Sequence, residues 1–223
     1  MNYKKHIASI IFLFIIIPNM LHASDTTLIK ISYGKSIFSK NEQFEELIKK
    51  YGDYQLFNNI KTSNIIINHY FYAGLGVNMI FSVGNNSKTI NSYNSSFFQY
   101  NISFGLNYEF IKINKFSSSI YTNIGFYYGQ YQFDDLRASY SSIDSVFTYG
   151  QTYFIKQNDF TYNFAIDFNY NIYKSLLFSI VLNYSSSLDK SHYYHNKSDV
   201  AILDLDKYKN TFYGIQFGLG YIF

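Results

Sequence analysis

Long stretches of the chain alternate strictly between apolar and polar residues. The segment 98–110 is aromatic or aliphatic at every second position, and the segment 162–172 repeats this pattern with a different sequence. Between the apolar positions of the first segment lie Gln99, Asn101, Ser103, Gly105, Asn107 and Glu109. Because successive side chains of a β-strand point to opposite faces, this period of two predicts strands with one apolar and one polar or small face.

Seven segments carry the alternation clearly. They are 27–37, 68–83, 96–110, 116–133, 159–172, 174–187 and 209–223. A bacterial barrel with both chain ends on one side of the membrane needs an even number of strands, so we expect an eighth. The candidate is the segment Leu56 to Ile67, which alternates poorly and is assigned from the parity of the strand number.

The predicted connections alternate between short and long. The segments 111–115 and 171–174 are short, whereas 134–156 and 189–207 are long and polar. The first long connection contains 42–50, where acids precede lysines and the apolar residues follow helical spacing, so we expect a short loop helix there. Short turns on one side and long loops on the other are typical of outer-membrane barrels.

A secreted β-sandwich is the alternative fold, because its strands also alternate. Three features favour the barrel. The segment 98–110 is far longer than the soluble strand of about 5 to 6 residues. Aromatic residues gather toward the strand ends, and the polar face is rich in Gly, Ser and Asn rather than Lys and Glu. The sequence therefore predicts an all-β fold: an eight-stranded antiparallel up-and-down transmembrane β-barrel with long outer loops and short periplasmic turns.

The first residues are typical of a secretory signal peptide. Two lysines lie within the first five residues, an apolar run covers Ile7 to Ile17, and the small residue Ala23 follows. An anchoring helix is the alternative, but the apolar run is about half the roughly 20 residues that a spanning helix needs. We expect a signal peptide over 1–23, cleaved after Ala23, and a barrel domain over 24–223.

Composition excludes several classes of protein. The chain has no cysteine, which excludes a disulfide scaffold and a thiol nucleophile. Removing the signal peptide with Lys4 and Lys5 leaves 16 basic against 15 acidic residues. This near-neutral balance argues against a nucleic-acid partner, because binding to phosphate backbones depends on many basic side chains.

The C-terminal strand resembles a known assembly signal. Gln216 is followed by Gly218 and then by alternating hydrophobic residues that include Tyr221 and end at Phe223. This pattern resembles the C-terminal β-signal of bacterial outer-membrane proteins, and the predicted architecture resembles the small eight-stranded barrels of the OmpA and opacity types. The resemblance implies export to the outer membrane of a diderm bacterium and contact with its lipid. It also implies that the barrel-assembly machinery reads the last strand, which closes the barrel against the first.

Few residues are candidates for catalysis or metal binding. His69 lacks a nearby serine at the spacing of the lipid A deacylase barrels, so we interpret it as a membrane-interface residue. His192 and His195 would share a metal on a helix, which the sequence does not indicate there. The segment Asp204-Leu205-Asp206 lacks the rest of a calcium loop, and Arg137 is expected in a surface ion pair. We predict no catalytic residue, cofactor or metal.

Three charged residues fall on the polar face near the inner ends of their strands: Lys30, Glu109 and Asp167. Buried charges persist only when they are paired and hydrogen-bonded. We therefore predict that Lys30 approaches Glu109 or Asp167 and that this ion cluster plugs the lumen. The resemblance to OmpA-type barrels implies the same role for the cluster. An eight-stranded barrel is only wide enough for side chains to fill it, so we do not expect a wide pore. Tyr121 and Tyr127 would occupy part of the interior.

These features support three functional hypotheses. The first is a non-enzymatic structural or adhesin-like surface protein, whose outer loops bind a host or envelope surface ligand. The second is a small, porin-like channel with a narrow pore. The third, a lipid-modifying enzyme, needs a nucleophile and an acid or base at the lipid-facing rim, and the sequence offers no such set.

Overall fold

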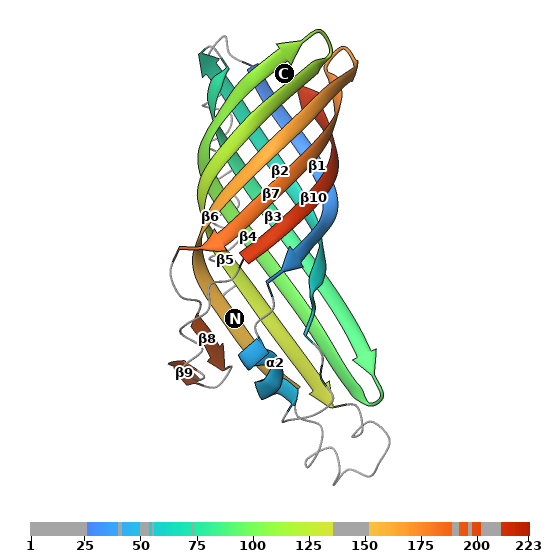
Figure 1. Ribbon diagram of the computed structural model, residues 1–223, viewed down its shortest axis with the longest axis vertical. Helices are drawn as coiled ribbons and strands as arrows, with labels where there is room; N and C mark the ends of the chain where they lie inside the picture. The colour runs from blue at the N-terminus through green and yellow to red at the C-terminus, as the bar shows by residue number, and fades with distance from the viewer. Residues whose placement is uncertain are drawn as a thin grey trace.

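Within the part of the chain that the structure describes, eight long antiparallel strands form a closed ring. The computed structural model describes residues 26–39, 42–49, 54, 56–72, 74–135, 152–188, 192–195, 198–201 and 211–223. Each long strand pairs with the next along the chain, and the last pairs with the first (Figure 1). The ring consists of β1 (Thr26–Phe38), β2 (Asn59–Tyr72), β3 (Leu75–Ile90), β4 (Tyr93–Ile113), β5 (Phe116–Asp135), β6 (Thr152–Tyr173), β7 (Leu176–Ser187) and β10 (Thr211–Ile222).

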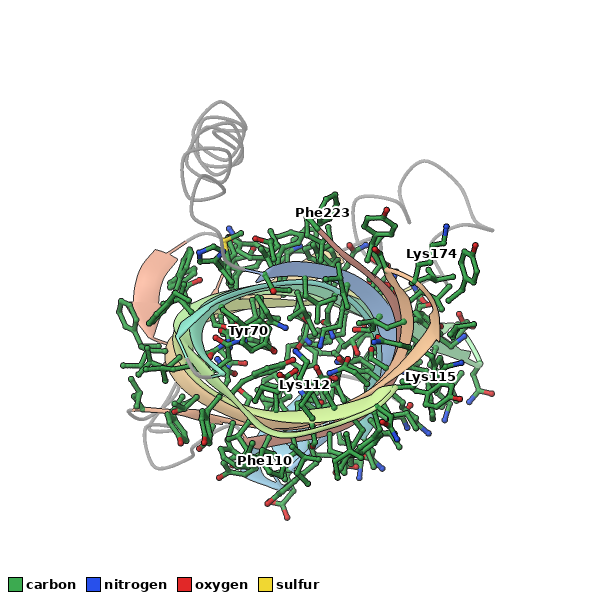
Figure 2. The ribbon with its side chains drawn as sticks, turned by 90° about the horizontal axis from the view of Figure 1, so that it is seen from above. Tyr70, Phe110, Lys112, Lys115, Lys174 and Phe223 are labelled. Atoms are coloured by element: carbon green, nitrogen blue, oxygen red, sulfur yellow. The ribbon has the colours of Figure 1, made fainter. Side chains whose placement is uncertain are left out.

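The strand alternation sorts side chains between the outside and the lumen. Along β10, Gln216 is 3% exposed, whereas the alternate aromatic and aliphatic residues from Tyr213 to Tyr221 are 44–56% exposed. Viewed along the barrel, Tyr70 and Lys112 lie inside the ring, and Phe110 and Phe223 lie outside (Figure 2). A continuous apolar outer surface is favourable in lipid and costly in water, so the alternation predicted the two faces correctly.

The strands differ greatly in length. β4, β5 and β6 have 21, 20 and 22 residues, whereas β1, β7 and β10 have 13, 12 and 12. The tight turns at Asn114 and Lys174 lie at the end where the chain also enters β1 and leaves β10 (Figure 1). The additional length therefore projects at the opposite end. We call this projecting sheet, formed by residues 85–98, 130–135 and 152–158, the outer extension.

The predicted strand 68–83 is wrong, because the chain turns in its middle. Gly74 has a φ of 81°, and a Cβ on it would lie 2.6 Å from the carbonyl oxygen of Glu109. Residues 68–72 therefore end β2, and β3 begins at Leu75. The eighth strand, expected at 56–67, exists at 59–72. The turn escaped prediction because apolar residues surround it on both sides.

Two outer connections are shorter than predicted. β3 and β4 extend to Ile90 and Tyr93 and are joined by a tight turn at Asn91, whose φ is 53°. β5 ends at Asp135 and β6 begins at Thr152, so the long connection expected over 134–156 covers only 136–151. Mainly polar residues continue β3 and β4, whereas the added start of β6 also contains Tyr153, Phe154 and Ile155. Polar residues can continue β3 and β4 because these strand ends project beyond the lipid, where both faces can carry polar side chains.

The outer connections also contain regular structure. The helix α2 (Glu42–Lys49) confirms the predicted loop helix, and its Lys49 pairs with Glu45 at 3.0 Å. The short strands β8 (His192–His195) and β9 (Ser198–Ala201) extend the sheet beside β6. Among the described residues, no helix is long and apolar enough to cross a membrane. The expected signal peptide lies outside the described residues and stays a prediction.

Candidate functional site

A buried ion pair crosses the lumen in its periplasmic half. Lys30 of β1 contacts Asp167 of β6, and both side chains have 0% exposure. Tyr121 of β5 donates a hydrogen bond to the same carboxylate and accepts one from the Lys30 ammonium at 2.7 Å. Asn68 donates to the Tyr121 hydroxyl at 3.0 Å, and Asn169 donates to Asp167 at 2.9 Å. Because β1 and β5 lie on opposite sides of the ring, this network ties the barrel wall together across its interior.

The structure does not bring Glu109 into this network. Glu109 pairs with Lys112 at 3.2 Å, at the periplasmic mouth. The register of β4 against β5 shifts between Glu109 and Ile111, and Lys112 then lies opposite Ser117 on the lumen side (Figure 2). Sequence reasoning missed Lys112 because a β-bulge exchanges the two faces of a strand without a local sequence signal.

Apolar side chains close the middle of the lumen. A small cluster of Ile66, Tyr121, Ala165 and Val181, with Ile80 against it, lies directly beside the ion-pair network through the shared Tyr121. Toward the outer end, a cavity of 60 Å³ remains between polar residues such as Asn101 and Gln216 and the rings of Tyr127 and Phe212. The lumen is thus filled by alternating polar and apolar layers.

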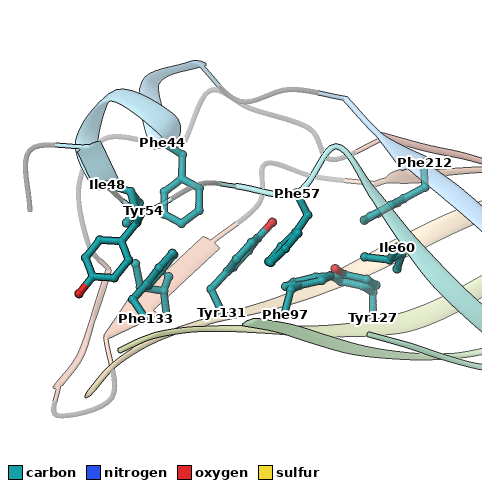
Figure 3. Packing of buried hydrophobic residues seen from close by; sticks show 11 residues of the cluster. Phe44, Ile48, Tyr54, Phe57, Ile60, Phe97, Tyr127, Tyr131, Phe133 and Phe212 are labelled. Carbon is teal, nitrogen blue, oxygen red and sulfur yellow. The ribbon is translucent and has the colours of Figure 1, made fainter. Parts of the chain in front are cut away.

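An aromatic core lies at the outer end of the barrel (Figure 3). Phe44 and Ile48 of α2 are 2% and 5% exposed and pack onto the inner face of the outer extension, where the Phe44 and Tyr131 rings are 5.3 Å apart. Tyr54 contacts Phe133 with a centroid distance of 5.2 Å. The outer core comprises Phe44, Ile48, Tyr54, Phe57, Ile60, Phe97, Tyr127, Tyr131, Phe133, Ile155 and Phe212.

The outer core was missed from the sequence, although a signal for it exists. Near the outer ends of the strands the strict alternation fails, and apolar residues occupy adjacent positions in Phe97-Phe98 and Tyr127-Tyr128. One member of each pair faces inward and is buried: Phe97 is 2% exposed and Tyr127 is 2% exposed. A strand that is apolar on both faces must be covered on both, which predicts a covering segment inside the outer mouth.

The outward side of the extension is polar. The apolar outer surface of the barrel gives way there to Asn85, Ser87, Ser96, Gln130 and Gln132. These residues line a cavity of 470 Å³ together with Lys61, Asn86, Phe97 and Phe98. The Phe98 ring is 44% exposed, and Tyr128 donates a hydrogen bond to Gln130 at 2.7 Å. We call the outward-facing set of Lys61, Asn85, Ser87, Ser96, Phe98, Gln130 and Gln132 the outer polar facet. Its amides and hydroxyls can donate and accept hydrogen bonds beside an exposed aromatic ring.

The remaining candidate residues have structural surroundings or lie outside the description. His69 lies near the end of β2 rather than at the start of a strand, and its Nδ1 is 3.0 Å from the Thr27 hydroxyl. His192 and His195 belong to β8, so the helical spacing needed for a shared metal is not formed. Arg137 and the segment 204–206 lie outside the described residues. Within the described part of the chain, no group of three or more His, Asp or Glu residues is placed to hold a metal ion.

The residues of the C-terminal signal occupy both faces of β10. Gln216 points into the lumen, where it accepts hydrogen bonds from Asn64 and Ser32. Gly218 also faces inward, beside Ser179. Tyr221 and Phe223 are 50% and 67% exposed on the lipid side, with their rings 4.9 Å apart. Recognition of these residues by the assembly machinery stays a prediction.

Comparison with known proteins defines the fold. No protein-family model matches the chain, and no curated protein sequence matches it. The outer-membrane attachment invasion locus protein Ail of Yersinia pestis aligns with a TM-score of 0.56 at 18% identity over 89% of this chain and 99% of that chain. Neisserial surface protein A aligns with a TM-score of 0.54 at 10% identity, over 87% of this chain and 96% of that chain. OprG of Pseudomonas aeruginosa aligns with a TM-score of 0.51 at 14% identity, over 92% of this chain and 98% of that chain.

This likeness, at such low identities, is one of fold. The chain has the fold of the small eight-stranded outer-membrane β-barrels. With its closed ring and apolar outer face, it is an integral β-barrel of the outer membrane. In such barrels the short turns lie in the periplasm, so the outer extension, α2 and β8 project from the cell.

Proposed function

We propose that this barrel is a non-enzymatic surface protein that binds a host or envelope ligand through its outer extension. The observation that carries the proposal is the outer core, which fixes α2 against the projecting strands. A binding loop is effective when a rigid scaffold holds it, because less conformational entropy is lost on binding. The extension has this property, since its inner face is packed with aromatic rings.

The outer polar facet is the face that we assign to the ligand. It lies just beyond the apolar belt, and its amide side chains surround an exposed ring. Such groups suit a neutral polar ligand such as a carbohydrate chain, which hydrogen-bonds to amides and packs on aromatic surfaces. Ail has been crystallised in complex with the heparin analogue sucrose octasulfate, and that structure aligns with this chain at 20% identity and a TM-score of 0.55. A barrel of this fold can therefore carry a sulfated sugar, whereas the facet of this chain, with Lys61 as its one charged residue, suits a neutral one.

Cell adhesion tests the proposal. The protein would be displayed on a laboratory bacterium without adhesins, and attachment to cultured epithelial cells counted. We expect attachment to rise several-fold with the wild type and to fall with the triple variant Asn85→Ala, Gln130→Ala, Gln132→Ala. The variant Tyr213→Ala, on the lipid side of β10, is the matched control and should attach normally. Equal attachment by wild type and triple variant would contradict the role of the facet.

A narrow channel is the second candidate function. It is favoured by the polar inward side chains, among which the buried Asn64, Asn78 and Asn123 each have a side-chain oxygen with no hydrogen-bond partner among the described residues. Such acceptors are satisfied by water, so the lumen is expected to be partly hydrated. The ion-pair network and the apolar layers oppose a continuous path for ions.

A further inference from the structure

Two neighbouring periplasmic turns each carry an exposed lysine. Lys115 lies in the turn from β4 to β5, and Lys174 lies in the turn from β6 to β7. The turns are adjacent, because the backbone N–H of Asn171 donates to the carbonyl of Lys115 at 2.7 Å and Phe116 pairs with Tyr170. Both lysines lie on the same side of the ring (Figure 2).

The positive charge of these two lysines is not neutralised within the described part of the chain. The ion pairs there involve Lys30, Lys49 and Lys112. Lys112, three residues before Lys115, is paired with Glu109 at 3.2 Å. The contrasting turn from β2 to β3 contains no charged residue between Tyr70 and Val77. The periplasmic rim therefore carries its positive charge on one side.

Lys174 occupies a backbone position that does not favour lysine. Its φ is 43°, in the left-handed region, where Gly and Asn are better accommodated. The corresponding positive-φ positions of two other tight turns are indeed occupied by Asn91 and Asn114. The turn alone therefore does not explain the choice of lysine, which indicates a use for the charged side chain.

An apolar surface lies directly beside the two lysines. Ile113 and Tyr173 are 64% and 65% exposed, and Tyr170, Phe116 and Leu176 continue this surface toward the middle of the membrane. The Lys174 ammonium lies 5.3 Å from the centroid of the Tyr173 ring. Aromatic residues at this level mark the boundary between lipid headgroups and acyl chains, and lysines near it extend toward the headgroups.

We propose that Lys115 and Lys174 bind the phosphate of an anionic phospholipid in the inner leaflet of the outer membrane. Basic residues at a membrane surface attract anionic headgroups, each contributing a modest and additive share of the affinity. The acyl chains of the lipid would lie on Ile113, Phe116 and Tyr173. The site is independent of the ligand proposed for the outer extension, which lies at the opposite end of the barrel.

Native mass spectrometry of the folded protein, released from micelles with equal amounts of phosphatidylglycerol and phosphatidylethanolamine, tests this site. We expect the wild type to retain phosphatidylglycerol preferentially. Lys115→Gln and Lys174→Asn should each lower that preference about fivefold. Lys174→Asn suits the left-handed backbone, so a folding defect is not expected from it. Lys35→Gln, which removes an exposed lysine of β1 that belongs to neither proposed binding surface, is the matched control and should leave the preference unchanged.

Three outcomes would overturn the proposal. The first is equal retention of the two lipids by the wild type. The second is a fall in preference with Lys35→Gln as large as with the turn variants, which would indicate a general effect of net charge. The third is displacement of the lipid by glycerophosphoglycerol at equal concentration. That result would mean that a free phosphate diester suffices and that the apolar surface does not hold a membrane lipid.

Discussion

At the scale of single residues, the Lys30–Asp167 pair is the most consequential contact in the lumen. Both side chains are fully buried, and Tyr121, Asn68 and Asn169 supply further hydrogen bonds. Transfer of an isolated charge into such surroundings is very costly. The pair therefore matters less for the attraction it adds than for the penalty that would follow if one partner were lost.

Removing one partner should destabilise the barrel strongly. We expect Asp167→Leu to lower the free energy of unfolding by about 3–5 kcal/mol, because Lys30 is left buried without a counter-charge. The double variant Lys30→Met, Asp167→Leu should recover most of that loss, since apolar side chains of similar size can replace a buried pair. Urea unfolding in lipid vesicles measures both. If the double variant is no more stable than the single one, the ion pair is not the source of the effect.

The sequence allowed part of this site to be predicted. Lys30 and Asp167 fall on the polar face of clear strands, and a buried charge requires a partner. The register between distant strands was needed to choose Asp167 over Glu109 and to bring Tyr121 between them. Lys112 could not be assigned to the lumen, because the bulge after Glu109 inverts the faces of β4.

At the scale of elements, α2 depends on the outer extension for its position. A helix of 8 residues is too short to be stable alone in water, so its packing must hold it in place. Phe44 and Ile48, one turn apart, supply that packing against the extension. The sequence predicted the helix from its apolar spacing, but not where it docks. The docking surface combines residues from β4, β5 and β6, which only the fold brings together.

Undocking α2 should expose the first outer connection to proteases without affecting the barrel. We expect the variant Phe44→Ala, Ile48→Ala to be cleaved near residues 40–50 at least tenfold faster than wild type, because the lost packing is worth about 3 kcal/mol or more. The exposed Glu46 on the same helix provides the control Glu46→Ala. Limited proteolysis of intact cells gives the rates. Equal cleavage of the double variant and the control would contradict the docking.

The last strand makes a separate prediction about assembly. Phe223 is 67% exposed on the lipid side, and its backbone N–H donates to the carbonyl of Thr27 at 2.8 Å. Phe223→Ala keeps that backbone bond, so refolding of the purified protein should be nearly unchanged. If the assembly machinery reads the terminal aromatic ring, the amount of folded protein in the outer membrane should fall several-fold. Tyr213→Ala alters another exposed aromatic residue of the same strand face and should have little effect. Similar losses in both variants would argue against a specific terminal signal.

At the scale of the whole molecule, the barrel combines an interior filled by polar and apolar side chains with a structured outer end. The fold class could be predicted because the alternation of most strands is recorded locally in the sequence, and parity then supplied the eighth strand. The unequal strand lengths could not, since the mainly polar residues that extend β3 and β4 beyond the lipid resemble loop residues. The outer core follows from this asymmetry: long strands need a cover on their inner face, and the first connection supplies it.

Conductance separates the surface-protein and channel functions for the intact molecule. Three groups of side chains fill the lumen: the ion-pair network, the Ile66 and Val181 cluster that shares Tyr121 with it, and the separate outer core. We therefore expect folded wild-type protein in a planar bilayer to show no discrete current steps. The variant Lys30→Met, Asp167→Leu should be equally silent, because it replaces one plug by apolar side chains and leaves the others in place. Insertion would be verified by the altered gel migration of unboiled protein.

Reproducible current steps from the wild type would favour the channel. Current steps seen only with the variant would instead identify the ion pair as the main barrier. They would also show that ions can pass the apolar layers.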